Sequence, residues 1–78
     1  MLENVRNYLY DKEYFIDLFP EGIHVFHYLD MLKLTDTEID LRMDDFILKI
    51  VGEELRVSKM NKEEIYIAGN IISLELER

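Results

Sequence analysis

The sequence predicts a mainly β (α+β) fold, a small antiparallel β-sheet or sandwich-like domain with one N-terminal amphipathic helix. From Ile23 to Arg78, apolar and polar residues alternate in successive short runs, and glycines stand between the runs. Side chains on a strand point to opposite faces with period 2, so each run describes a strand with one buried and one solvated face. Residues 1–19 instead repeat their apolar positions at helical spacing.

The predicted helix occupies residues 1–19. Four apolar side chains recur along it at helical spacing: Leu2, Val5, Leu9 and Ile16. Three aromatic residues lie close to the same side: Tyr8, Phe15 and Phe19. Polar residues occupy the remainder: Glu3, Asn4, Asp11, Lys12 and Asp17. This pattern is typical of an amphipathic helix that covers one face or edge of a sheet. Pro20 is expected to end this helix because proline lacks the amide hydrogen that a helix requires, and Gly22 follows in a turn.

The alternating region predicts a series of short strands joined by polar turns. Strands are expected near residues 23–28, 31–34, 38–43, 46–51, 55–57, 65–68 and 71–76. Turns are expected at residues 35–37, 44–45 and 61–63, where Thr, Asp, Asn and charged residues gather. This order of elements indicates a single β-rich domain with no second domain or linker.

One four-residue match competes with this assignment. Thr35 and Glu38 have the spacing of a capping box, which would begin a helix. The residues that follow alternate strictly between apolar and charged types, from Glu38 to Met43. Alternation over six residues outweighs the capping match, so a strand is predicted.

Two glycines occupy matching places in two similar stretches, residues 46–57 and 64–76. Gly52 is expected to allow a bend or a β-bulge. Gly69 is expected to form either a tight hairpin turn or another bend. The similarity indicates a duplicated strand–bend–strand unit, although two copies are too few for a solenoid.

Composition limits the classes of function. The chain has 78 residues, 49% of them hydrophobic, which suits one small domain with a core and predicts that further apolar surface is buried by self-association. It contains no cysteine, which excludes disulfides, thiolate metal sites and a cysteine nucleophile. Its net charge of −8 disfavours direct binding to nucleic acid or to an anionic membrane. A protein partner, or a second copy of the chain, is expected instead.

The sequence predicts a soluble, cytoplasmic protein. Its first residues, from Met1 to Val5, lack the basic region and apolar block of a secretory signal. No apolar run approaches the roughly 20 residues needed to span a bilayer as a helix.

From Ile23 onward the chain resembles the YabP/YqfC family of small sporulation proteins from endospore-forming bacteria. The resemblance is carried by a leading strand at residues 23–26, a segment at residues 38–42, and the two glycine-containing stretches at residues 48–57 and 64–71. About two thirds of the chain takes part. The resemblance implies a role in spore formation and supplies no catalytic residues.

Three acidic residues form the first candidate partner-binding site. Glu38, Asp40 and Asp44 are predicted to lie on one face of a strand, where neighbouring side chains of the same face are about 7 Å apart. Such a ladder could imitate a nucleic-acid backbone and block a basic groove on another protein. It could equally be a solvated face that keeps the sheet soluble, and Arg42 interrupts it.

Aromatic residues near the start form the second candidate site. Tyr8, Phe15 and Phe19 belong to a segment rich in large rings. Rings at this density mark either a packed contact of the helix on the sheet or an anchor for a homodimer or a protein partner.

No residue pattern predicts catalysis, a cofactor or a metal. His24 and His27 are an odd number of positions apart, so on a strand they point to opposite faces and cannot share a metal ion. The acidic pairs Asp44-Asp45 and Glu63-Glu64 lie in predicted turns, where water keeps both members ionised. The sequence therefore favours a non-enzymatic structural or interaction protein, and the resemblance implies that it is associated with sporulation. The alternative is a small acidic inhibitor, encoded by a phage or another mobile element.

Overall fold

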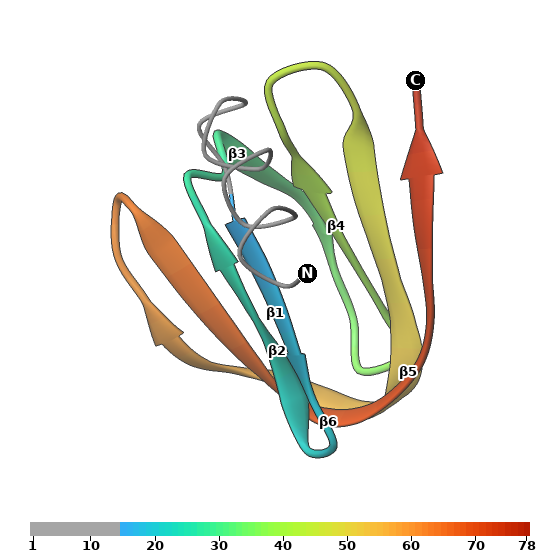
Figure 1. The fold of residues 1–78 in the computed structure, drawn as a ribbon. Helices are drawn as coiled ribbons and strands as arrows, with labels where there is room; N and C mark the ends of the chain where they lie inside the picture. The colour runs from blue at the N-terminus through green and yellow to red at the C-terminus, as the bar shows by residue number, and fades with distance from the viewer. Residues whose placement is uncertain (1–14) are drawn as a thin grey trace, which may run out of the picture.

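The computed structural model describes residues 15–78, which form one six-stranded antiparallel sheet (Figure 1). The strands follow the order β1-β2-β6-β5-β4-β3 across the sheet. Their bounds are Phe15–Phe19 (β1), Gly22–Phe26 (β2), Asp30–Leu34 (β3), Glu38–Arg42 (β4), Ile47–Met60 (β5) and Glu64–Glu77 (β6). The prediction of a mainly β, antiparallel domain is confirmed.

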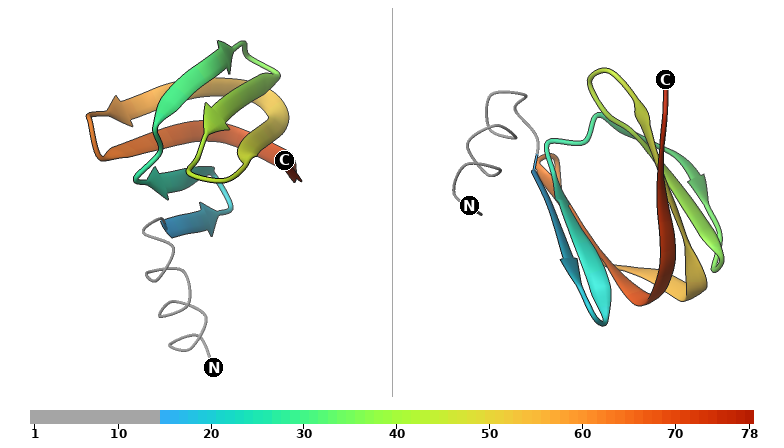
Figure 2. Two further views of the ribbon diagram at one scale, coloured as in Figure 1. Left: turned by 90° about the horizontal axis from the view of Figure 1, so that it is seen from above. Right: turned by 45° about the vertical axis from the view of Figure 1, so that its right-hand side comes forward.

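The sheet folds into two layers because β5 and β6 bend in the middle (Figure 2). The first part of β5 pairs with β4 and with the last part of β6, whereas the last part of β5 pairs with the first part of β6. Layer A therefore contains β1, β2, residues 64–68 of β6 and residues 56–60 of β5. Layer B contains β3, β4, residues 47–51 of β5 and residues 71–77 of β6.

Glycines make these bends possible. The register between β5 and β6 shifts between Val51 and Gly52, and a Cβ on Gly52 would lie 2.2 Å from the carbonyl oxygen of Asn70. Gly69 has a φ of +136°, a backbone conformation that other residues rarely adopt. Gly52 is therefore part of a bulge, as predicted, and of the two alternatives for Gly69 the structure has the bend within a continuous strand.

In each layer a hairpin turn forms a hydrogen bond with one of the two glycine bends. The β1–β2 turn accepts a hydrogen bond from the amide of Gly69 through the carbonyl oxygen of Glu21, at 2.9 Å. The β3–β4 turn accepts one from the amide of Gly52 through the carbonyl oxygen of Thr37, at 3.0 Å. Each hairpin thus contacts one of the two bends, in keeping with the repeated pattern around the two glycines.

The core lies between the layers and is apolar. Most of its side chains come from alternating positions of β2, β4, β5 and β6, while Tyr28 and Met43 come from the segments that follow β2 and β4. No polar or charged residue within residues 15–78 is fully buried. The core residues are Ile23, Val25, Tyr28, Ile39, Leu41, Met43, Leu48, Ile50, Leu55, Ile65 and Ile67. Their burial is the main favourable contribution to the free energy of folding.

The predicted helix is wrong where the structure can test it, because Phe15–Phe19 is the edge strand β1. Pro20 and Glu21 form a two-residue turn, and Phe19 pairs with Gly22 to close a β1–β2 hairpin. Aromatic and β-branched residues favour strands, and this local preference is reinforced by pairing with β2. Residues 1–14, which hold the rest of the predicted helix, lie outside the described residues.

The turn at residues 35–37 shows how the capping pattern is used in a sheet. The hydroxyl of Thr35 accepts a hydrogen bond from the amide of Glu38 at 2.9 Å and also contacts the amide of Thr37 at 3.2 Å. These are the contacts of a capping residue, but they close the β3–β4 turn, so the predicted strand is confirmed. Among residues 15–78 there is no helix long and apolar enough to cross a membrane.

Candidate protein-interaction surface

Aromatic side chains gather on the outer face of layer A, away from the core. Strand alternation and register bring them together: Phe15 lies opposite Phe26, and His24 lies between Asp17 on β1 and Tyr66 on β6. Phe19 lies at the other end of β1. We call this set the aromatic surface: Phe15, Phe19, His24, Phe26 and Tyr66.

The rings form one connected cluster. The centroids of Phe15 and Phe26 are 5.7 Å apart in an edge-to-face arrangement, and those of His24 and Phe26 are 4.4 Å apart. His24 also contacts Tyr66 at 5.7 Å, and Tyr66 stacks with Phe19 at 6.1 Å. These separations are typical of favourable aromatic pairs, so the rings hold one another in place.

A polar contact lies within the cluster. Nε2 of His24 donates a hydrogen bond to Oε1 of Glu64 at 2.6 Å, and each side chain is 21% exposed. Glu64 is opposite Phe26 in the sheet. The hydrogen bond from His24 holds the pKa of Glu64 below its usual range, and a weaker one from Asn61 acts in the same direction. The contact fixes the orientation of the imidazole between the two neighbouring rings.

The exposure of the aromatic surface is unusual for the solvent side of a sheet. Phe19 is 42% exposed, and the other four rings are half-buried. The outer face of an antiparallel sheet is commonly polar, whereas clustered, partly exposed rings are typical of protein interfaces. The geometry of layer A therefore suits the binding of another protein.

Two of the predicted aromatic residues belong to this surface. Phe15 and Phe19 lie on the same face of β1, while Tyr8 lies outside the described residues. His24, Phe26 and Tyr66 also belong to this surface, which the sequence pattern did not predict. Their alternation along β2 and β6 was visible, but only the pairing of β1, β2 and β6 places them beside one another.

The acidic candidates are arranged differently from the prediction. Glu38 and Asp40 lie on the outer face of β4 in layer B, as expected. Asp44 does not share this face, because β4 ends at Arg42 and Asp44 lies exposed in the following turn. The turn forms there because the amide of Met43 donates to the carbonyl oxygen of Phe46 at 2.8 Å, which closes the β4–β5 hairpin.

Lysines lie among the acidic side chains of layer B. Nζ of Lys33 is 3.2 Å from Oε1 of Glu38, and Nζ of Lys49 is 3.9 Å from Oε2 of the same carboxylate. Lys49 is also 3.8 Å from Glu77 and lies opposite Asp40 in the sheet. The outer face of layer B is therefore a mixed ion-pair network rather than a continuous acidic ladder.

Asp40 is the most constrained carboxylate of this network. Its Oδ1 is buried without a hydrogen-bond partner among the described residues. Burial raises the pKa of Asp40, and the neighbouring Glu38 raises it further. The hydrogen bond with Asp40 lowers the pKa of Glu38, and Lys33 lowers it further.

We expect Asp40→Asn to remove a pH-dependent destabilisation. Because the folded-state pKa of Asp40 is raised, its contribution to stability is present at low pH and is lost as pH rises through that pKa. The asparagine cannot ionise, so the variant should gain stability relative to the wild type as pH increases. Urea unfolding between roughly pH 3 and pH 7 measures this difference. Asp36→Asn, at an exposed turn, is the control and should show no such trend.

The histidines do not form a metal centre. His24 contacts Glu64, while His27 follows β2, is exposed and has a φ of 62°. No group of three or more potential ligands that could hold a metal ion occurs in residues 15–78.

Comparison with known proteins found no relative. No protein-family model, no curated protein and no solved structure matches this chain.

Proposed function

We propose that this protein is a non-enzymatic interaction protein of spore formation, which acts in the cytoplasm through protein–protein contacts. The observation that carries the interaction role is the aromatic surface on the outer face of layer A. The resemblance of residues 23–78 to the YabP/YqfC family carries the role in spore formation. The interaction role and the role in spore formation rest on independent observations, and each role has its own test.

The physical basis of binding is the burial of rings that are already ordered. The edge-to-face contact of Phe15 with Phe26 and the stacking of Phe19 on Tyr66 limit ring motion before a partner arrives. A partner that covers these rings therefore loses little side-chain entropy for the apolar area that it buries. Large rings of this kind are the residues that most often dominate the energy of an interface.

The alternative of an acidic inhibitor is less well supported. A mimic of nucleic acid requires an uninterrupted series of negative charges, and Lys33 and Lys49 lie within 4 Å of Glu38 on the face concerned. The net charge of −8 supports either role. Salt separates them, because binding by charge mimicry weakens steeply at high salt and binding by buried rings does not.

We expect the double substitution Phe19→Ser and Phe26→Ser to abolish partner binding. Loss of two ring anchors should weaken binding at least about 30-fold, the effect of one interface hot spot. In the organism that encodes this chain, deletion of the gene should lower the number of heat-resistant spores. The wild-type gene should restore that number, and the double variant should not.

The matched control replaces two exposed leucines elsewhere, Leu29→Ser and Leu32→Ser. This control should restore spore formation as well as the wild type does. Normal spore counts in the deletion strain would contradict the role in spore formation. Full complementation by the Phe19→Ser and Phe26→Ser variant would contradict the role of the aromatic surface.

A further inference from the structure

Each layer has one edge formed by a long bent strand rather than by a hairpin. In layer A this is residues 56–60 of β5, which we call the β5 edge. In layer B it is residues 74–77 of β6, which we call the β6 edge. Within residues 15–78, each of these segments pairs with a strand on one side only. Unpaired strand edges are templates for pairing with another chain.

Along the β5 edge, the backbone amide and carbonyl groups of Val57 and Met60 point outward, away from β6. The amide of Asn61 donates to the carbonyl oxygen of Glu64 at 2.9 Å, which closes the β5–β6 hairpin. Hydrogen-bonding direction alternates along a strand, so the groups of Met60 point away from β6. A bulge leaves Ser58 out of the pairing with β6 and preserves this alternation. The backbone groups of Val57 therefore also point outward.

Along the β6 edge, the backbone amide and carbonyl groups of Leu74 and Leu76 point outward, away from β5. The β4–β5 hairpin is closed by the hydrogen bond between Met43 and Phe46, so by alternation Leu48 directs its groups toward β4. Leu76 pairs with Leu48 on the other side and therefore directs its own groups away from β5. Leu74, two residues earlier, does the same.

The side chains of the two edges are complementary. On the side that continues the core, the β5 edge presents Met60, which is 51% exposed, and the β6 edge presents Leu74 and Leu76, which are 36% and 67% exposed. These leucines lie opposite residues that are at most 1% exposed, so they are core-facing side chains that the described residues cover only in part.

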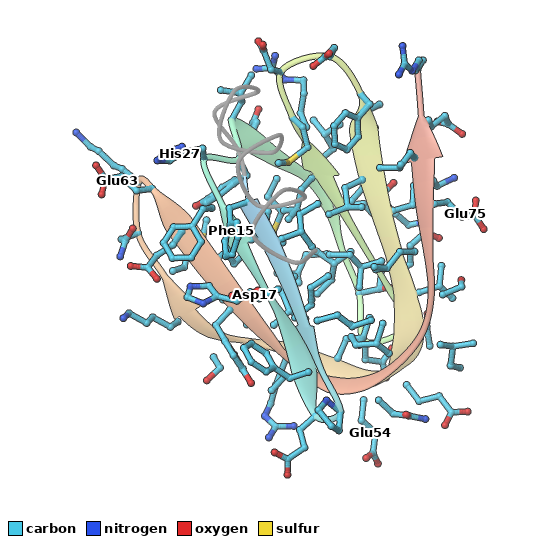
Figure 3. All side chains as sticks on the ribbon, in the orientation of Figure 1. Phe15, Asp17, His27, Glu54, Glu63 and Glu75 are labelled. Atoms are coloured by element: carbon cyan, nitrogen blue, oxygen red, sulfur yellow. The ribbon has the colours of Figure 1, made fainter. Side chains whose placement is uncertain are left out.

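Opposite charges occupy the outer side of the two edges. The β5 edge presents Arg56 and Lys59, and the β6 edge presents Glu75 and Glu77. Glu75 extends away from the molecule at the margin of layer B (Figure 3). Among the described residues, neither Arg56 nor Glu75 takes part in an ion pair.

We infer that the β6 edge of one copy pairs in antiparallel fashion with the β5 edge of a second copy of this chain. One register satisfies both sets of side chains at once. It places Leu74 opposite Met60, Glu75 opposite Lys59, Leu76 opposite Val57, and Glu77 opposite Arg56. The inference rests on the proposed role as an interaction protein and adds self-association to it.

Backbone geometry supports the same register. The outward-directed groups belong to Met60 and Val57 on one edge and to Leu74 and Leu76 on the other, so the apolar pairs are the hydrogen-bonded pairs. The oppositely charged pairs then fall at the non-hydrogen-bonded positions, where side chains approach most closely. A shift by one residue would place charges opposite apolar residues and lose both kinds of contact.

The two edges lie on opposite sides of the molecule (Figure 1). Two copies therefore cannot satisfy both edges of each other, and the contact is head-to-tail. Each contact joins layer B of one copy to layer A of the next, and repetition produces an open chain or a ring. Only four or five residues of each edge take part, so we expect a dissociation constant of roughly 0.1–1 mM.

Charge reversal tests this pairing in the full-length chain. Sedimentation velocity of the wild type from roughly 10 µM to 1 mM should show association that increases with concentration. Glu75→Lys alone and Lys59→Glu alone each place like charges opposite one another and should sediment as monomers throughout. The double variant, and an equal mixture of the two single variants, should associate again because opposite charges meet.

Glu53→Lys is the matched control, since it makes the same charge change at an exposed position outside both edges. It should associate like the wild type. A wild type that stays monomeric at about 1 mM, single variants that still associate, or a double variant that fails to recover would each overturn the inference. If these edges instead pair with a strand of another protein, the wild type should stay monomeric, which is the first of these results.

The same samples separate this inference from the proposed function. The Phe19→Ser and Phe26→Ser variant leaves both edges intact and should still associate with itself. Glu75→Lys leaves the aromatic surface intact and should still bind the protein partner. Loss of one property without the other identifies which proposal has failed.

Discussion

Gly69→Ala is expected to destabilise the protein by about 3–5 kcal/mol, a large part of its total stability. Gly69 has a φ of +136°, and a Cβ at this position would lie 2.8 Å from the carbonyl oxygen of Glu54. A side chain therefore meets both an unfavourable backbone conformation and a fixed backbone atom. A domain of this size has roughly 4–12 kcal/mol of stability, so much of the variant should be unfolded at moderate urea concentrations. Urea unfolding followed by circular dichroism measures the loss.

Ala68→Gly is the control for this substitution. It makes the reverse exchange, alanine to glycine, at the neighbouring residue of the same strand, where φ is not positive. It should cost only about 1 kcal/mol, through the greater flexibility of glycine in the unfolded chain. A loss below about 1 kcal/mol for Gly69→Ala would show that the bend tolerates a side chain, and that the glycine does not determine where β6 changes layer.

The alternation of side chains was sufficient to predict most of the strands, because burial between two layers imposes period 2 on the sequence. It failed at residues 15–19, where Ile16 fits both a helical repeat that begins at Leu2 and a strand that pairs with β2. Five residues are too few for periodicity to separate the two possibilities. Hydrogen bonding of β1 to residues 22–26 decided the outcome, and no local pattern records that pairing.

The interaction surface was harder to predict than the fold. Phe19 and Tyr66 are 47 positions apart in the sequence, and their strands both pair with β2, one on each side. The two rings stack across β2. Recognising these two residues as neighbours requires the order of the strands in the sheet. That order cannot be read from the strands one at a time, because β6 bends and takes part in both layers. The position of Asp44 was predicted wrongly for a related reason, since its place depended on where β4 ends and not on the alternation itself.

The bends connect stability to interaction. Gly52 and Gly69 direct each long strand from one layer into the other, which leaves one end of each strand at a sheet margin. The first part of β6 pairs with β2 in layer A, where Tyr66 reaches His24 and Phe19. The last part of β6 lies in layer B, where it forms the β6 edge. The bend at Gly69 therefore gives one strand a part in both proposed contacts.

Ile67→Ala is expected to cost about 3–5 kcal/mol through the cavity that it leaves in the core. Ile67 is 0% exposed and lies in β6 between Ile23 on β2 and Val57 on β5. Its neighbours are held by the backbone pairing of three strands, so they cannot move far to fill the space. The loss of favourable burial therefore adds to the unfilled volume. Chemical unfolding in urea, with the slope of the transition compared between variant and wild type, gives the change in free energy.

Ile72→Ala makes the same chemical change in the same strand and separates burial from residue type. Ile72 is 60% exposed and occupies the extra position where the register of β6 shifts against β5. Its substitution should change stability by less than about 0.5 kcal/mol. Equal losses at the two positions would mean that Ile72 is buried as Ile67 is. Ile72 is two and four positions from Leu74 and Leu76, so this side of β6 would then be covered and would offer less exposed apolar area for pairing with a second copy.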